Sequence, residues 1–450
     1  MSKTLPNFFP HDASTLSAAI NPADFVPFID NPFMTLEPGT TFVSESPDGQ
    51  TIDNFEVTRQ TKVIDGVTCV VVRDVTTVDG VLQENTLDYF AQDTLGNVWY
   101  FGEDAKSFDN GHVDTSGSWR AGVNGAEPGI IMEAHPQVGD EYDQEIADAD
   151  GAHDHAQVLS LTDAVSVPYG SFDHLLKTAE TSITEPGALE FKSYAAGVGV
   201  ISDVDPVSGD VSLLVQIKVD GTNQGDTLFG YGGPDQIEGK GGSDSLDGHD
   251  GGDTIYGGSG NDTLDGGNDT VGDHLDGGSG NDLLLTRIAD QVAGGNGDDT
   301  VRLFDNSGFG MIDGGDQKGH DLGVHQGDVL QFNGSLDLTL PSVSGRIHGI
   351  ETLSMKDGQG GGSLTLNVND VLDLGDGTFA PQIDGEHAPG KGAALRVNGD
   401  SGDQLTLNGA FWNAIDASNA PNDYNAYASQ SPGGNVYVLV HDDVTVNLTS

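Results

Sequence analysis

Residues 21–220 carry short runs of β-branched and aromatic residues, and turn-forming dipeptides separate the runs. VTCVVVRDVTTV, VLQENTLDYFAQD and NVWYFGEDA follow one another in this way. Asp65-Gly66, Asp79-Gly80 and Asn110-Gly111 are typical of two-residue hairpin turns, because both turn positions need positive φ. The pattern therefore predicts successive strands of an antiparallel meander.

A second group of β-type runs completes this region: AQVLSLTDAVSVP, SFDHLLKTAE, ALEFKSYAAGVGVISDV and DVSLLVQIKV. Trp99, Tyr100 and Phe101 would place aromatic rings on both faces of one strand. Such a strand suits a strongly curved sheet or half-barrel that is covered on each side. For these rings and Tyr89, core packing is the commoner role, and lining a ligand cleft is the alternative.

The pattern changes abruptly near Gly221, since residues 221–302 contain 23 glycines and 16 acidic residues but only three basic ones. Aspartates recur there, mostly nine residues apart, and an aliphatic residue stands two positions after each. Nine turns in one phase form a solenoid period. The aspartates are Asp226, Asp235, Asp244, Asp253, Asp262, Asp273, Asp282, Asp290 and Asp299, and the aliphatic residues are Leu228, Ile237, Leu246, Ile255, Leu264, Leu275, Leu284, Val292 and Val301.

Each position of this period has a physical role. The aliphatic residue ends a three-residue strand and adds one rung to a thin core. The preceding residues must turn sharply, and glycine permits positive φ and close backbone approach. Stacked turns then gather carboxylates and backbone carbonyls into cages of oxygen, which suit Ca²⁺ because it tolerates irregular oxygen geometry. Without the ion the aspartates repel, so metal binding and folding are expected to be one event.

GGSGNDTLD, GGSGNDLLL and GGNGDDTVR resemble the repeats-in-toxin (RTX, hemolysin-type) calcium-binding nonapeptide G-G-x-G-x-D-x-aliphatic-x. The resemblance implies a right-handed parallel β-roll in which two repeats make one coil, with several Ca²⁺ ions held between next-but-one turns. The implied carboxylate ligands are Asp226, Asp235, Asp244, Asp253, Asp262, Asp273, Asp282 and Asp299. The implied backbone carbonyl ligands are Gly239, Gly242, Gly248, Gly257, Gly260, Gly277, Gly280, Gly294 and Gly297.

Some turns depart from this consensus. Tyr231, Lys240 and His249 replace the second glycine of their repeats, and the Asp273 turn carries two extra residues. The turn around Asp290 (TRIADQVA) has no glycine, so it is not expected to bind calcium.

Charge narrows the possible partners. The chain has 17 Lys and Arg against 71 Asp and Glu, a formal net charge of −54, so nucleic acid and anionic lipid are not expected partners. Cys69 is the only cysteine, which excludes an intramolecular disulfide. Residues 1–20 read as a loose leader without the apolar segment of a signal peptide, and no apolar run is long enough to span a bilayer.

The RTX resemblance also implies a route out of the cell. Such repeats mark bacterial proteins that a type I ABC transporter exports unfolded, through an uncleaved C-terminal signal. Residues 303–450 are expected to form a C-terminal β region with that signal, and VYVLVHDDVTVNLTS reads equally as a signal or a final strand. The N-terminal region resembles an uncharacterised bacterial extracytoplasmic β family, through stretches such as NPFMTLEPGTTFV and LDYFAQDTLGNVWYFGED.

Two classes of function remain open. The first is an all-β, secreted, calcium-binding protein in which the β-roll supports an N-terminal β domain (residues 21–220) with a structural or binding role, with a cell-surface or extracellular ligand as its partner. The second is a secreted enzyme or transition-metal protein. His135, His153 and His155 are its candidate metal ligands, although solvated loop histidines are the commoner outcome. Ser171, Asp173 and His174 are adjacent in sequence and read as a turn and the start of a strand rather than a catalytic triad.

Overall fold

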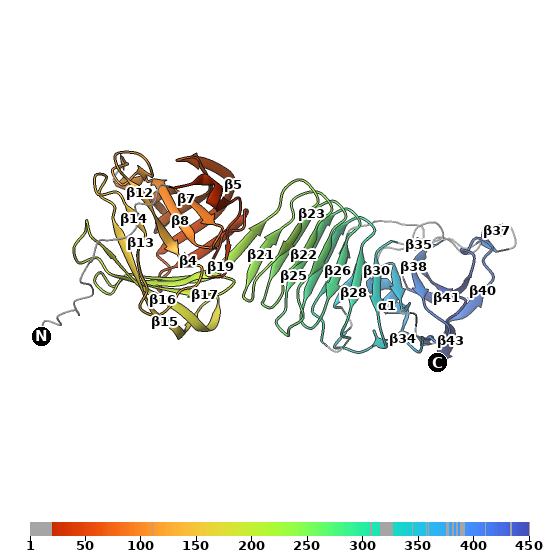
Figure 1. The fold of residues 1–450 in the computed structure, drawn as a ribbon. Coiled ribbons are helices and arrows are strands. Elements are labelled where there is room, and N and C mark those ends of the chain that lie inside the picture. Colours follow the sequence, from red (N-terminus) through yellow and green to blue (C-terminus); the bar gives the residue numbers. More distant parts are fainter. Residues whose placement is uncertain are drawn as a thin grey trace, which may run out of the picture.

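In the computed structural model, an N-terminal curved β domain, a stack of short parallel strands and a C-terminal β region follow one another along the molecule (Figure 1). The structure describes residues 20–450 except 110, 307, 316–326, 344, 357, 359, 375–377, 380–381, 384–385, 388–391, 410, 433 and 450. The expected leader therefore lies almost wholly outside the described residues. Within those residues, no helix has the length and apolar character needed to cross a membrane.

The N-terminal domain is built on two antiparallel runs, β4–β8 and β15–β19, which join edge to edge where β19 pairs with β4. This closure produces the strongly curved sheet that the sequence predicts. The elements are η1 (Pro22–Asp24), β1 (Phe25–Val26), β2 (Asp30–Asn31), β3 (Met34–Thr35), β4 (Thr40–Glu45), β5 (Thr51–Ile64), β6 (Val67–Val78), β7 (Val81–Asp93), β8 (Val98–Asp104), β9 (Ser107–Asp109), β10 (His112–Asp114), β11 (Trp119–Arg120), β12 (Glu127–Met132), β13 (Glu141–Asp143), β14 (Glu145–Ile146), β15 (Asp154–Val167), β16 (Gly170–Ser182), β17 (Glu190–Ala195), β18 (Gly199–Val204) and β19 (Val211–Asp220).

The predicted hairpin turns are present. Asp65-Gly66 and Asp79-Gly80 have positive φ at both residues, and they connect β5 to β6 and β6 to β7. Asn110 lies outside the described residues, while Gly111 has positive φ between the paired strands β9 and β10.

Both faces of the curved sheet are covered. On one face the Tyr100 ring stacks on Phe90, with ring centroids 4.9 Å apart. On the other face Phe25 packs edge-on against Trp99 and Phe101. Phe101 is fully buried and Tyr89 nearly so. Core packing therefore accounts for these aromatic residues.

The stack of parallel strands grows directly from the N-terminal domain, because β19 also pairs in parallel with β21, with Ile217 opposite Asp235. Successive strands then alternate between two sheets, as expected if two repeats make one coil. One sheet contains β21 (Asp235–Glu238), β23 (Thr254–Ser259), β25 (His274–Ser279), β27 (Gln291–Asn296), β29 (Ile312–Gly315) and β32 (Ile347–His348). The other contains β20 (Thr227–Phe229), β22 (Ser245–Asp247), β24 (Thr263–Asp265), β26 (Leu283–Thr286), β28 (Thr300–Leu303), β30 (Val329–Phe332) and β33 (Thr352–Ser354).

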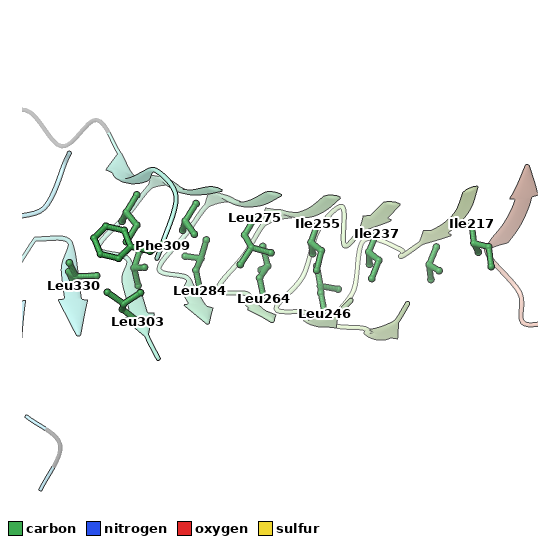
Figure 2. Packing of buried hydrophobic residues seen from close by; sticks show 14 of the residues in the cluster. Ile217, Ile237, Leu246, Ile255, Leu264, Leu275, Leu284, Leu303, Phe309 and Leu330 are labelled. Carbon is green, nitrogen blue, oxygen red and sulfur yellow. The ribbon is translucent and has the colours of Figure 1, made fainter. Parts of the chain in front are cut away.

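The aliphatic residue of each turn points between the two sheets. Figure 2 shows Ile237, Leu246, Ile255, Leu264, Leu275 and Leu284 as a row of rungs, all at most 1% exposed. Like residues stack on one another, since Leu246 lies opposite Leu264 and Ile255 opposite Leu275. The predicted thin core is therefore present, and it continues without a break into the core of the N-terminal domain.

Parallel stacking continues past residue 303. After β33 the second sheet adds β38 (Gly392–Asn398), β42 (Gly434–His441), β41 (Tyr424–Ser431) and β40 (Asn413–Ile415), and β35 (Thr378–Phe379) pairs with β38. A further sheet contains β31 (Ser335–Asp337), β34 (Ser363–Leu366), β39 (Gln404–Asn408) and β43 (Thr445–Thr449), and β36 (Gln382–Ile383) pairs with β37 (Glu386–His387).

SLTLNVNDVLDL lies in the expected C-terminal β region but is only partly β. Ser363–Leu366 is the strand β34, and Val368–Leu374 forms the helix α1. The Asn367 side chain explains the change, since its Oδ1 accepts the N–H groups of Asn369 and Asp370, as a helix cap does.

Candidate metal centre

The turns of the β-roll approach each other so closely that only glycine fits at certain positions. Gly242, Gly260, Gly280 and Gly297 all have φ between +118° and +144°. A Cβ atom on Gly260 would overlap the carbonyl oxygen of Gly242 in the turn below, and one on Gly280 would overlap that of Gly260. These glycines bring the backbone of one turn against the backbone of the next-but-one turn, as expected for this repeat.

The aspartates form two ladders along the roll. In each ladder, the backbone N–H of one aspartate donates to Oδ1 of the aspartate one coil further on. The first ladder runs Asp226, Asp244, Asp262, Asp282, Asp299 and Asp328, with N···O distances of 2.7–2.8 Å. The second runs Asp235, Asp253, Asp273 and Asp290, with distances of 2.9–3.2 Å.

In most ladder aspartates, the second carboxylate oxygen accepts no hydrogen bond. Among the described residues, Oδ2 has no hydrogen-bond partner in Asp244, Asp253, Asp262, Asp282, Asp299 and Asp328, and each of these atoms is buried. A buried carboxylate oxygen without a partner is energetically costly. Six such atoms at equivalent positions indicate a common missing partner rather than isolated packing defects.

Backbone carbonyls lie beside these unpartnered oxygens. A Cβ on Gly257 would be 2.6 Å from both Asp262 Oδ2 and the carbonyl oxygen of Gly277. Gly239 has the same relationship to Asp244, as do Gly248 to Asp253, Gly277 to Asp282 and Gly294 to Asp299, each with the carbonyl of the next-but-one turn. A carboxylate and a carbonyl oxygen therefore converge at each glycine. This is an all-oxygen donor set of the kind that calcium prefers.

Burial also raises the pKa values of these aspartates. The pKa is raised to about 8 in Asp253, to about 7 in Asp282 and to about 6 in Asp299, chiefly because burial disfavours the charged form. Neighbouring aspartates add to the rise in each case. A bound cation would offset both effects, so the residues present fit a metal ion.

The first aspartate of each ladder differs from those in the interior. Asp226 Oδ2 accepts from the backbone N–H and the hydroxyl of Thr222. Asp235 Oδ2 accepts from the backbone N–H of Tyr231, and its Oδ1 accepts from the Tyr169 hydroxyl. The sequence places both aspartates among the ligands, whereas their carboxylates already have hydrogen-bond donors.

Asp290 also has donors for both oxygens, from the backbone N–H groups of Asp273 and Arg287. The hydrogen bonds to Asp290 therefore satisfy both oxygens of its carboxylate without a metal ion.

Asp328 is a further ladder member, which the nine-residue period does not predict. It is fully buried, its Oδ2 is among the unpartnered atoms, and burial raises its pKa to about 8. The pattern Asp-x-aliphatic is present at Asp328 and Leu330, but 29 residues separate Asp328 from Asp299, so the nine-residue spacing does not reveal it.

The histidine candidates lie in the N-terminal domain. His155 Nδ1 is 2.9 Å from Asp143 Oδ1, and the same oxygen is 3.7 Å from His153 Nε2. His153 Nδ1 is 2.7 Å from Asp148 Oδ1, and His135 is exposed. Across the described part of the chain, no group of three or more His, Cys, Asp or Glu side chains is arranged to hold a metal ion. The β-roll differs because its donors are single carboxylates combined with backbone carbonyls.

The remaining candidate residues, Ser171, Asp173 and His174, lie at the start of β16, just after the hairpin turn that joins it to β15. His174 has positive φ, and its side chain and that of Asp173 are both 81% exposed. Ser171 exchanges a hydrogen bond with Ser166 across the hairpin.

Comparison with known families identifies the repeat. Residues 220–255, 238–271, 247–284 and 289–303 each match the RTX calcium-binding nonapeptide repeat. The fold and this match together support a β-roll built from calcium-binding repeats. The region from 220 to 303 carries RTX repeats, as its glycine and aspartate pattern predicts.

Comparison with whole proteins adds little. No curated protein matches the chain. Two solved structures share 13% identity with it: a provisionally assigned lipoprotein from Parabacteroides distasonis ATCC 8503, covering 41% of this chain and 97% of its own, and a provisionally assigned exported protein with a YmcC-like fold from Bacteroides fragilis NCTC 9343, covering 42% and 98%. Their TM-scores are 0.27 and 0.26.

Proposed function

We propose that the interior turns of the β-roll bind several Ca²⁺ ions through one aspartate carboxylate and adjacent glycine carbonyls. The proposal rests on the buried, unpartnered Oδ2 atoms, five of which lie beside a backbone carbonyl of the next-but-one turn. The carboxylate ligands are Asp244, Asp253, Asp262, Asp282 and Asp299. Asp273 is included because it lies in the interior of the second ladder. Bound calcium supplies the positive charge that neutralises these buried carboxylates.

Folding of the β-roll is coupled to this binding. The roll buries a single aliphatic rung per turn, while its turns bring many carboxylates together. Because charge repulsion and carboxylate burial oppose folding, the metal-free roll is unstable and the ion contributes folding free energy directly.

Calcium counting and circular dichroism on the full chain test this proposal. With a chelator we expect loss of β signal from the roll, and with millimolar calcium we expect its recovery and several bound ions per chain. Asp262→Asn should bind fewer ions than the wild type. Asp276→Asn should bind the wild-type number, since Asp276 lies beside Leu275 on β25 and so faces outward. Identical spectra with and without calcium, and no bound ion, would contradict the proposal.

We also propose that the protein is secreted through a type I ABC transporter and folds outside the cell. Cytosolic calcium is too low to load weak sites, whereas extracellular calcium is in the millimolar range that such sites need. Co-expression with a type I exporter is expected to bring the full chain into the medium, while a chain ending at Asp400 stays inside the cell. Equal export of both chains would show that the residues after Asp400 carry no signal needed for export.

The N-terminal domain is proposed to have a structural or binding role. In support, its strand β19 belongs to both the curved sheet and the roll, so a ligand held by the domain is attached firmly to the roll. Pull-down of extracellular ligands with the calcium-loaded chain, and with calcium withdrawn, tests this role.

A further inference from the structure

The β-roll does not end where the recognisable repeats end. Val301 on β28 lies opposite Leu330 on β30, and Leu330 lies opposite Leu353 on β33. All three side chains are fully buried and extend the row of rungs. The strands beyond residue 303 thus keep the register of the roll, although their sequence has lost the glycine-rich consensus.

The carboxylate position is also kept in these added coils. Asp328 stands two residues before Leu330, and Glu351 stands two residues before Leu353. The backbone N–H of Asp299 donates to Asp328 Oδ1 at 2.8 Å, and the backbone N–H of Asp328 donates to Glu351 Oε2 at 2.9 Å. Glu351 therefore takes the place of an aspartate one coil further along the first ladder.

The close backbone approach that accompanies each site in the repeats recurs here as well. A Cβ on Gly294 would lie against both Asp299 Oδ2 and the carbonyl of Gly314. A Cβ on Gly314 would overlap the carbonyl of Gly349 and lie 2.8 Å from Cβ of Asp328. A Cβ on Gly314 would thus meet the Asp328 side chain and the Gly349 carbonyl, just as one on Gly294 would meet the Asp299 side chain and the Gly314 carbonyl.

Asp328 has a buried carboxylate oxygen without a partner, as the interior aspartates of the repeats do. Its side chain is fully buried, and its Oδ2 has no hydrogen-bond partner within the described part of the chain. Among those residues no basic side chain makes an ion pair with it, whereas two more carboxylates, those of Asp299 and Glu351, belong to the neighbouring coils of the same ladder. Hydrogen-bond donors do not satisfy this oxygen, so a cation is the partner that its surroundings favour.

We propose that the Asp328 turn is an additional calcium site outside the RTX repeats, with the Asp328 carboxylate and the carbonyl of Gly349 as donors. This inference rests on the proposed calcium binding of the roll. The site joins the roll to the C-terminal region, because Asp328 precedes β30, the Asp328 carbonyl accepts the N–H of Thr352 on β33, and Gly349 follows β32. Calcium at this position therefore orders the first C-terminal strands as well as the repeats.

Counting bound ions by native mass spectrometry tests the site. The Asp328→Asn variant keeps an acceptor for the N–H of Asp299 and is expected to bind one calcium fewer than the wild type. The control is Asp416→Asn, an exposed aspartate that follows β40 in the C-terminal region; it should bind the wild-type number. A wild type that binds several ions and an Asp328→Asn variant that binds equally many would overturn this inference alone. A wild type that binds none would overturn the proposed function as well.

Hydrogen exchange on the wild type gives a second measurement if Asp328→Asn fails to fold. Amides of Val329–Phe332 and Thr352–Ser354 are expected to become protected in the same calcium range that protects β24 and β26. If these strands are equally protected with chelator, or stay unprotected when the repeats are loaded, the Asp328 site does not exist.

Discussion

The Tyr169 hydroxyl donates a 2.7 Å hydrogen bond to Oδ1 of Asp235, the first aspartate of the second ladder. At later turns, the equivalent oxygen accepts a backbone N–H from an aspartate one coil earlier, as Asp253 Oδ1 does from Asp235. The strand before β21 in this sheet is β19 of the N-terminal domain, and a tyrosine of that domain supplies the donor to Asp235. Tyr169 is 2% exposed, so the N-terminal domain closes this end of the roll.

Replacing Tyr169 by phenylalanine should therefore weaken the junction. The variant leaves a buried carboxylate oxygen without its donor, which costs about 1–3 kcal/mol. The expected result is a lower denaturant midpoint for the calcium-loaded chain with an unchanged number of bound ions. Tyr256→Phe is the control, since Tyr256 lies on the outer face of β23. Equal midpoints for the two variants would show that the hydroxyl contributes nothing.

Two alanine substitutions test whether the space beside a glycine is needed for calcium binding. Neither Gly277 nor Gly232 has positive φ, so alanine strains neither backbone. A Cβ at Gly277 would lie 2.5 Å from Asp282 Oδ2 and 2.6 Å from the carbonyl of Gly294, whereas nothing lies within 4 Å at Gly232. We expect Gly277→Ala to bind fewer calcium ions in equilibrium dialysis and Gly232→Ala to match the wild type. A full complement of ions in Gly277→Ala would exclude its neighbours as ligands.

The rungs of the thin core should be sensitive to truncation. Leu264 is fully buried between Leu246 and Leu284, so Leu264→Ala is expected to lower the free energy of unfolding by about 2–5 kcal/mol. Leu228 is only partly buried at the start of its row, and Leu228→Ala should cost less. Chemical denaturation at saturating calcium measures both. If the two losses are similar, the rungs do not act as a continuous core.

The N-terminal domain should lose stability as the pH rises. Glu145 is 7% exposed, and burial, with the charges of Asp154 and Glu103, raises its pKa to about 8. The folded state therefore binds a proton that the unfolded chain has released above pH 4.5. Between those values, stability falls with increasing pH by up to about 1.4 kcal/mol per pH unit for this group.

Glu145→Gln tests that slope because the amide stays neutral. At saturating calcium, the unfolding free energy of this variant should fall less steeply between pH 5 and pH 8 than that of the wild type. Glu127→Gln, at an exposed position on β12, should keep the wild-type slope. A Glu145→Gln slope as steep as the wild type would show that Glu145 is ionised in the folded protein.

Local patterns predicted the roll well, because each of its turns is specified by its own few residues. The Asp-x-aliphatic phase located the rungs, and the hairpins at Asp65-Gly66 and Asp79-Gly80 followed from turn chemistry alone. Asp328 was missed because a longer connection breaks the spacing while the stacking continues. The bond from Tyr169 to Asp235 joins residues 66 apart, so it depends on tertiary packing that no local pattern encodes.

The two-strand coil has a consequence for how such a molecule can change length. Hydrogen-bonded aspartates such as Asp244 and Asp262 are 18 residues apart, so one full coil is the unit that keeps both rows of metal ligands aligned. Insertion or deletion of a single nine-residue turn would move every later strand to the other of the two sheets. The region beyond the change would then face the opposite side of the roll. Loss or gain of a pair of turns would only shorten or extend the rod by about 4.8 Å. The distance between the N-terminal domain and the C-terminal region can therefore change only in steps of one turn. Their relative orientation is kept only when the number of added or removed turns is even.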